Sequence, residues 1–265
     1  MRVILDIGSN DGFNSLAFAI LNPNIDVFSF EPNPYLKKIL LKNKKIIEKN
    51  FKINLKNFNF VPKAVSNASG RNIFYITKNN ATSSLLKPRK QLNRYWTNNK
   101  DLSIKNISDW IKVKKKVKVE TIKLKEFCDK KKISKICYIH CDTQGNDLKV
   151  FEGLGKYRKI VQEGVLESVI NSKLSLYNNS TNLKKIKKKF KYWGYKINSI
   201  KEFHKKNPER NIYFTNTKMQ KNKGINQPSE SNLRLISRIL KNKIRTKDLI
   251  NIFFIKKNIS FNLFR

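Results

Sequence analysis

The sequence predicts an α/β fold with a doubly wound, mostly parallel sheet. Two observations support this fold class: short apolar runs alternate with stretches of helical periodicity, and the first apolar run ends in a glycine-rich turn before a helix. A chain of 265 residues can bury one good core. We therefore expect one domain over residues 1–217 and a basic, partly helical C-terminal appendage over residues 218–265, where the composition changes.

The expected strands are short runs of aromatic and β-branched residues, and the expected helices carry lysine and aliphatic residues at a spacing of three or four. The first half of the chain is expected to form strand 3–5, helix 13–20, strand 27–30, helix 35–50, strand 58–65 and antiparallel strand 71–77. Residues 78–116 lack clear periodicity, which is typical of a functional lid or a flexible insertion. The second half is expected to form strand 117–121, helix 124–132, strand 135–141, strand 164–168, helix 182–193 and a terminal hairpin of strands 195–200 and 211–215.

The turn after the first strand has the composition of a ligand-binding loop. Gly8 and Gly12 permit backbone conformations that are closed to other residues, and they let a ligand approach the main chain. Ser9, Asn10 and Asp11 lie between them and supply oxygens that can cap a helix. For this stretch alone, an ordinary strand-to-helix connection rich in capping residues remains the alternative.

A carboxylate follows the second strand, about one strand–helix–strand unit beyond the glycines. In nucleotide-binding sheets an acidic residue at this place, here Glu31, accepts hydrogen bonds from ribose hydroxyls. The first turn reads Asp-x-Gly-x-x-x-Gly and not the Gly-x-Gly-x-x-Gly that brings the backbone against a pyrophosphate. S-adenosylmethionine, which has a ribose but no phosphate, therefore fits better than NAD. Asp6 is expected to hold its amino group, directly or through water.

The formal net charge is +38, from 57 lysine and arginine and 19 aspartate and glutamate residues. Lysine, asparagine and isoleucine dominate the whole chain, as an A/T-rich coding sequence would produce, so much of this charge is expected to be solvated surface. A field of that size still attracts polyanions such as nucleic acid, anionic lipid or acidic glycan. We expect this attraction to be weak and unspecific, with no specific nucleic-acid partner, since no RNA-binding module is recognisable.

The three cysteines are an odd number without metal-ligand spacing, so we expect reduced thiols and no metal site in a cytoplasmic protein. The first apolar stretch contains Asp6 and does not resemble a signal peptide, and no apolar run is long enough to span a membrane. Aliphatic and basic residues alternate from Leu233 to Lys257. Their apolar face is expected to pack on the domain; a membrane-peripheral position on an anionic surface is the alternative.

With these elements in place, the sequence resembles the FkbM family of S-adenosylmethionine-dependent methyltransferases over roughly residues 3–217. The matching stretches include "LDIGSNDGFNSL" at 5–16, "FSFEPNP" at 28–34, "VPKAVSNASG" at 61–70, "TSSL" at 82–85 and "YIHCDTQGNDLKVFEGL" at 138–154, and the likeness continues through "VLES" at 165–168 and "NIYFTN" at 211–216. The resemblance implies a Rossmann-like, seven-stranded methyltransferase fold. It also implies O-methylation of a hydroxyl on a sugar, glycan or secondary metabolite.

The resemblance also assigns site residues. The resemblance implies a set of cofactor contacts, and we include the neighbouring residues of the same stretches in this set. The expected cofactor-binding residues are Asp6, Gly8, Ser9, Asn10, Asp11, Gly12, Asn14, Glu31, Pro32, Ala64, Val65 and Asp142. The family commonly has lysine where this chain has His140 and often glutamate where it has Gln144. Gly145 and Asp147 follow Asp142, the acid at the end of the expected strand 135–141. At position 147 this chain has aspartate, which is shorter than glutamate.

Methyl transfer to an alcohol oxygen needs an aligned acceptor and a base within hydrogen-bond reach. Asp142, at the carboxyl end of a strand, is the first candidate for this base, and His140, on the same strand face, is the second. Glu167 could bind an acceptor hydroxyl. Two alternatives remain open for these residues: His140 can be a hydrogen-bonded core residue, and Glu167 can pair with a lysine. Two alternatives also remain open for the protein, which can be an RNA-directed methyltransferase or a non-catalytic scaffold. The oligomeric state is also open.

Overall fold

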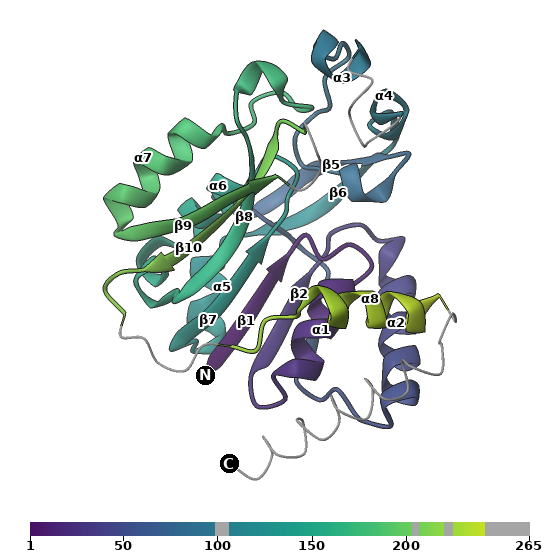
Figure 1. The fold of residues 1–265 in the computed structure, drawn as a ribbon, viewed down its shortest axis with the longest axis vertical. Coiled ribbons are helices and arrows are strands. Elements are labelled where there is room, and N and C mark those ends of the chain that lie inside the picture. The colour runs from purple at the N-terminus through teal and green to yellow at the C-terminus, as the bar shows by residue number, and fades with distance from the viewer. Residues whose placement is uncertain (99–105, 203–206, 220–224, 242–265) are drawn as a thin grey trace.

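The computed structural model describes residues 1–98, 106–202, 207–219 and 225–241, and a seven-stranded sheet runs through it (Figure 1). Its strand order is β3-β2-β1-β7-β8-β10-β9. The strands are β1 Arg2–Ile7, β2 Asp26–Phe30, β3 Phe58–Val61, β7 Lys135–Cys141, β8 Glu163–Val169, β9 Tyr195–Glu202 and β10 Glu209–Asn216. The first five of these pair in parallel, and β10 pairs antiparallel with both β8 and β9. The predicted sheet and its terminal antiparallel pair are confirmed.

Helices cover both faces of this sheet because its strands are apolar on both sides. Val3, Leu5 and Ile7 pack in one core with residues of α5 Leu124–Lys131, α6 Asp147–Gly153 and α7 Leu183–Trp193. Ile4 packs in a second core with α1 Phe13–Leu21, α2 Leu36–Phe51 and α8 Glu230–Leu240. The chain order reverses direction at β1, whose neighbours are β2 and β7. Open α/β sheets bind their ligands at such a switch point, beyond the carboxyl ends of the strands.

A second, three-stranded sheet lies beside the carboxyl edge of the first (Figure 1). It consists of β4 Ala64–Val65, β6 Val113–Ile122 and β5 Gly70–Thr77, in that order. The prediction of one strand over 58–65 was wrong, because β3 ends at Val61 and β4 belongs to the other sheet. Pro62 has no N–H to continue the ladder, and the chain turns there with the Lys63 N–H donating to the Val61 carbonyl. The strand expected over 117–121 is longer and begins at Val113.

The segment predicted to be irregular, 78–116, holds three short helical elements and the start of β6. These are η1 Asn80–Thr82, α3 Arg94–Asn98 and α4 Ile107–Trp110, and residues 99–105 lie outside the described part of the chain. Trp96, Ile107 and Ile111 are buried against Leu176 and Tyr177, so this segment forms a small separate core together with the chain before α7. Further along the chain, α6, η2 Gly155–Ile160 and η3 Ser172–Leu174 are elements that the sequence reading did not assign.

The described part of the C-terminal segment packs on α1 and α2. Leu235, Ile236 and Ile239 of α8 are each about 1% exposed within the core that these helices form. Asn226 fixes the approach to α8 by hydrogen bonds with Asn22 and the carbonyl of Leu21. The alternating stretch that we expect to continue to Lys257 lies outside the described residues beyond 241. As far as Leu240, its apolar face packs on the domain.

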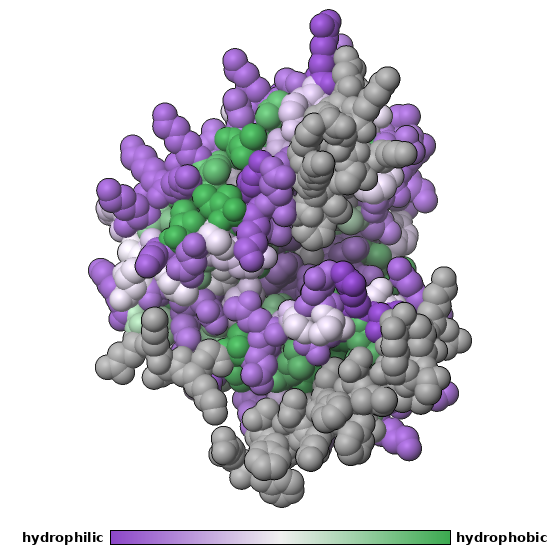
Figure 2. Space-filling view, in the orientation of Figure 1, coloured by the Kyte–Doolittle hydropathy of each residue, from purple (hydrophilic) through white to green (hydrophobic). Residues whose placement is uncertain are grey.

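The charged surface agrees with the expectation of solvated lysines. Hydrophilic side chains project over α7 (Figure 2), where most of the helix lysines are exposed around the buried Ile186 and Phe190. All three cysteines are buried and unpaired. Within the described ranges, no helix combines the length and the apolar character needed to cross a bilayer.

Candidate active site

A cavity opens at the carboxyl ends of β1, β2 and β7, under the three-stranded sheet. Eleven of the fourteen residues that we assigned to the site line it: Gly8, Ser9, Asn10, Asp11, Asn14, Glu31, Pro32, Ala64, Val65, His140 and Asp142. Asp6, Gly12 and Glu167 do not line this cavity. The motifs of the first, second and seventh strands therefore meet in one place, although more than a hundred residues separate the first from the last.

The loop after β1 is held close to the loop after β7. The backbone N–H groups of Gly8 and Ser9 both donate to the Phe30 carbonyl, at 2.9 and 3.0 Å. Gly8 has φ +83°, and a Cβ at this residue would lie 1.9 Å from the carbonyl oxygen of Asp142. Gly12, at φ +80°, packs against the Leu40 side chain. Gly8 is thus required by the close approach of two loops, and Gly12 by packing at the start of α1.

Glu31 lies at the end of β2 with each carboxylate oxygen in a backbone hydrogen bond. The Asn10 N–H donates to Oε2 at 2.8 Å and the Asn33 N–H donates to Oε1 at 2.7 Å. Burial raises the pKa of Glu31 to about 7, against the lowering effect of these two hydrogen bonds. Each carboxylate oxygen can accept a further hydrogen bond from the cavity side, because it has two lone pairs. A carboxylate held in this way fits the two hydroxyls of a ribose.

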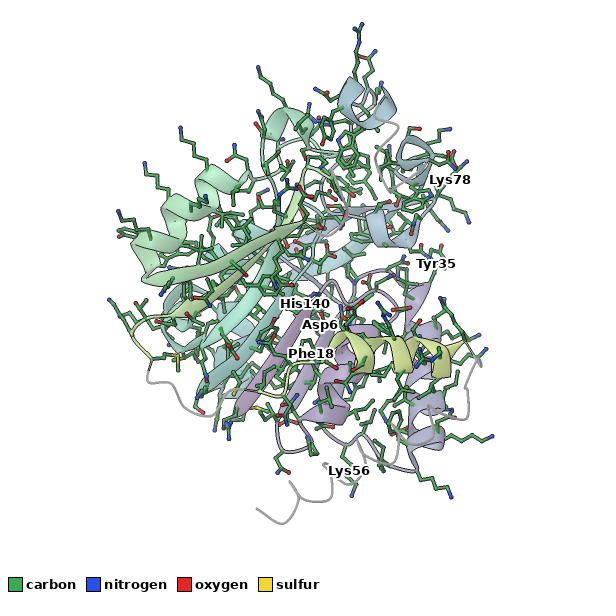
Figure 3. All side chains as sticks on the ribbon, viewed as in Figure 1. Asp6, Phe18, Tyr35, Lys56, Lys78 and His140 are labelled. Atoms are coloured by element: carbon green, nitrogen blue, oxygen red, sulfur yellow. The ribbon has the colours of Figure 1, made fainter. Side chains whose placement is uncertain are left out.

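Asp6 is fully buried and contacts His140 instead of the cavity. Its Oδ1 lies 2.8 Å from His140 Nδ1, and its Oδ2 accepts a hydrogen bond from the Ser15 hydroxyl. The three labels at the centre of Figure 3 mark Asp6, His140 and Phe18, whose ring centroid is 6.5 Å from that of the imidazole. Burial lowers the pKa of His140, but the hydrogen bond and charge of Asp6 and the charges of Asp142 and Asp147 outweigh it, and the pKa is raised.

Asp142 and Glu167 are joined by one side chain, that of Gln144. Its Nε2 donates to Asp142 Oδ1 at 2.7 Å and to Glu167 Oε2 at 3.1 Å. The Tyr177 hydroxyl lies 2.9 Å from Gln144 Oε1 and donates there or to the Thr82 carbonyl. Burial raises the pKa of Glu167 well above its ordinary value, and the negative charge of Asp142 adds to this. Gln144 thus lies between Glu167 and Asp142, and Tyr177 contacts Gln144.

Several cavity residues were missed by sequence reasoning. They are Lys63 between β3 and β4, Phe74 of β5, Asn80, Ala81, Ser83 and Leu85 in the segment that follows β5, and Thr143, Gln144 and Asn146 after β7. The stretch "TSSL" at 82–85 was part of the resemblance and is the signal that could have located Ser83 and Leu85. Within the described ranges, no three His, Cys, Asp or Glu side chains lie close enough together to hold a metal ion.

Two features define a Rossmann-like methyltransferase fold. The sheet has this strand order with an antiparallel β10, and the cavity at its carboxyl edge is lined by both a glycine turn and a carboxylate. A family profile described as the methyltransferase FkbM domain matches residues 6–197. This match covers well over half of the sequence, and the chain belongs to the FkbM methyltransferase family.

Individual relatives are distant. The chain is 25% identical over 158 residues to the 2-O-methyltransferase NoeI of Sinorhizobium fredii, a match that covers 57% of this chain and 56% of that protein. The chain thus spans about half the length of this curated relative. Among solved structures it is similar to the methyltransferase FkbM of Methylobacillus flagellatus (TM-score 0.46, 11% identity, 81% of this chain and 44% of that one). It is also similar to M. capricolum TrmK in complex with S-adenosylhomocysteine (TM-score 0.40, 13% identity, 98% and 91%).

Proposed function

We propose that this protein is an S-adenosylmethionine-dependent O-methyltransferase that acts on a hydroxyl of a sugar, glycan or secondary metabolite. The observation that carries the proposal is the placement of Glu31 in the cavity, opposite the glycine turn of Gly8 and beside Asn10. The cofactor would supply a methyl group on a positively charged sulfur. Glu31 would hold its ribose, and the loop from Gly8 to Asn14 would enclose the rest of the donor.

The choice of oxygen as acceptor draws on the relative and on the residues beside the donor. The name of NoeI specifies transfer to oxygen. In this chain, His140 and Asp142 both line the cavity. Either group can accept a proton or a hydrogen bond from an alcohol, which is a poor nucleophile without such help.

A groove that continues from the cavity is suited to a sugar. It shares Asn10, Asp11, Asn80 and Ala81 with the cavity and extends along Leu36, Ile39, Lys78, Asn79, Asp109 and Trp110. An indole ring beside amide and charged groups can pack against the apolar face of a sugar and hydrogen-bond its hydroxyls. Lys63 lines the cavity and Lys78 lines the groove, but each is ion-paired, with Glu120 and Asp109 at 2.6 and 2.9 Å, so these lysines do not by themselves select an acidic sugar.

Calorimetry on the full chain tests the proposal at the donor. We expect binding of S-adenosylmethionine and S-adenosylhomocysteine and no binding of NAD. Tight NAD binding without a response to either methyl-donor ligand would overturn the assignment.

A panel with radiolabelled methyl donor tests the acceptor. It would contain deoxysugars, uronic acids, nucleotide sugars and bulk RNA, and we expect label on a sugar hydroxyl. Label on RNA alone would make the protein a nucleic-acid methyltransferase. Donor binding without transfer to any member would favour the scaffold.

A further inference from the structure

Asp6 and His140 lie side by side because of the register of two neighbouring strands. β1 and β7 run parallel, and Asp6 is paired with His140 in their ladder. The two side chains emerge on the sheet face that α1 covers, since Ser15 of α1 bonds Asp6 and Phe18 of α1 packs near the imidazole (Figure 3). The contact between Oδ1 and Nδ1, at 2.8 Å, is therefore fixed by backbone pairing and not by a flexible loop.

The surroundings of Asp6 separate it from the cavity. The residue is 0% exposed, both of its oxygens have a partner, and it does not line the cavity. A donor amino group could reach Asp6 only by displacing Ser15 or His140. This geometry therefore does not favour our prediction that Asp6 holds the amino group of the methyl donor.

The contact with Asp6 decides which nitrogen of His140 carries the proton. An ionised carboxylate only accepts hydrogen bonds, so Nδ1 must donate, and the neutral ring then has its lone pair on Nε2. The His140 side chain is 22% exposed and lines the cavity. Among the residues that the structure describes, none is hydrogen-bonded to Nε2. This nitrogen is left for a group in the cavity.

We propose that His140 is the catalytic base of the reaction and that Asp6 is its positioning residue. The inference rests on the proposed function. As the acceptor oxygen bonds to the methyl carbon, its proton passes to Nε2, and the electron pair of the broken carbon–sulfur bond stays on sulfur. Asp6 holds the ring in place and stabilises the imidazolium that forms, as the aspartate does in a Ser-His-Asp triad.

The neighbouring carboxylate, Asp142, is better suited to orient the acceptor than to take its proton. Its Oδ1 already accepts a hydrogen bond from Gln144, which is shared with Glu167. The ring of Phe18 from α1 and the carboxylate of Asp6 from β1 lie against the imidazole, and the charges of Asp142 after β7 and Asp147 from α6 also act on it. All the charged groups among them are negative and favour a protonated ring.

The ring protonation can be measured without any acceptor. The chain contains two histidines, so the variant His204→Ala leaves His140 as the single imidazole in a ¹⁵N NMR titration of the full chain. We expect the neutral ring to carry its proton on Nδ1 and to titrate above the ordinary pKa of about 6.5. In Asp6→Asn the pKa should fall below that value, since burial then acts with less opposition. If the neutral ring carries its proton on Nε2 in the chain that retains Asp6, the proposal is overturned.

Calorimetry and turnover separate a positioning role from a ligand role for Asp6. We expect S-adenosylhomocysteine to bind Asp6→Asn within about threefold of the unmodified chain. A loss of tenfold or more would make Asp6 a cofactor ligand and overturn the proposal. With a sugar acceptor from the panel, His140→Gln should lose about 10²–10⁴-fold in kcat, and Asp6→Asn should shift the acidic limb of the pH profile to lower pH. Full activity of His140→Gln would exclude the imidazole as base.

These outcomes also distinguish the inference from the function on which it rests. If the unmodified chain binds neither methyl-donor ligand, the proposed function fails, and the base assignment fails with it. If the donor binds and the tautomer or the Asp6→Asn results differ from those expected, the inference alone fails.

Discussion

Glu31 and Glu167 are both glutamates near the carboxyl ends of parallel strands, but their surroundings differ. Glu31, after β2, lines the cavity and accepts two backbone N–H groups. Glu167, on β8, is covered by Gln144 and accepts a hydrogen bond from it. Near Glu167 lie the carboxylates of Asp142, Glu209 and Asp147, whose charges raise its pKa further.

The comparison shows that a strand end alone does not make a carboxylate available to a ligand. The loop that packs over the strand end determines whether a ligand can reach the carboxylate. Above β2, the loop after β1 contributes backbone donors and leaves the cavity open. Above β8, the segment after β7 returns with a glutamine side chain, and Tyr177 holds that side chain in place. We therefore expect donor affinity to depend on the β1–β2 edge and to be insensitive to Glu167.

The largest expected effect on donor affinity is that of Glu31→Ala. The substitution would remove the acceptor of two ribose hydroxyls, and each hydrogen bond to a charged acceptor contributes about 1.5–3 kcal/mol. The Kd for S-adenosylhomocysteine, measured by calorimetry, should rise at least about tenfold. Glu31→Gln retains the side-chain shape and one acceptor oxygen, so its Kd should lie between the values for the unmodified chain and for Glu31→Ala. An unchanged Kd in Glu31→Ala would show that another residue holds the ribose.

Donor affinity should also depend on pH through Glu31. The ionised carboxylate is the form that accepts both hydroxyls, and its pKa in the ligand-free protein is about 7. Affinity should therefore fall as the pH falls, with Kd about tenfold higher at pH 6 than at pH 8. In the absence of ligand the raised pKa acts in the opposite direction, since the folded state binds the proton more tightly and loses this stability as the pH rises from 4.5 to 7.

Calorimetry in buffers with different ionisation enthalpies checks this pH dependence, because proton release on binding changes the observed heat. Glu31→Gln is the matched control and should bind with a flat pH dependence. If the slope survives in Glu31→Gln, a different group, such as His140, is responsible for it.

The smallest effect is expected for Glu167→Gln. Its amide oxygen can still accept the hydrogen bond from Gln144, and a neutral amide suits a position where burial and the nearby carboxylates raise the pKa of Glu167 well above its ordinary value. The Kd for S-adenosylhomocysteine should stay within about threefold of the unmodified chain. A tenfold loss would place Glu167 at the bound donor and remove the contrast with Glu31.

Local patterns predicted the parallel sheet and about half of the residues that line the cavity, because the glycine turn and Glu31 each follow directly from a strand. The residues that patterns could not place are those whose partners are distant in the sequence. Asp6 meets His140 across 134 residues, and Gln144 meets Tyr177 across 33. Strand register sets the first contact and the path of the chain between β8 and α7 sets the second, and neither leaves a periodic signal. For the same reason, periodicity read 58–65 as one strand, although Pro62 divides it between two sheets.

The position of α8 has a consequence for the synthesis of the chain. This helix, at residues 230–240, completes the core over α1 and α2, which are formed by residues 13–51. At a translation rate of roughly 5–20 residues per second, residue 240 is added roughly 9–38 s after residue 51. During this interval the apolar side chains that α8 will cover are exposed on the nascent chain. The face formed by α1 and α2 is therefore open to aggregation until α8 has been synthesised.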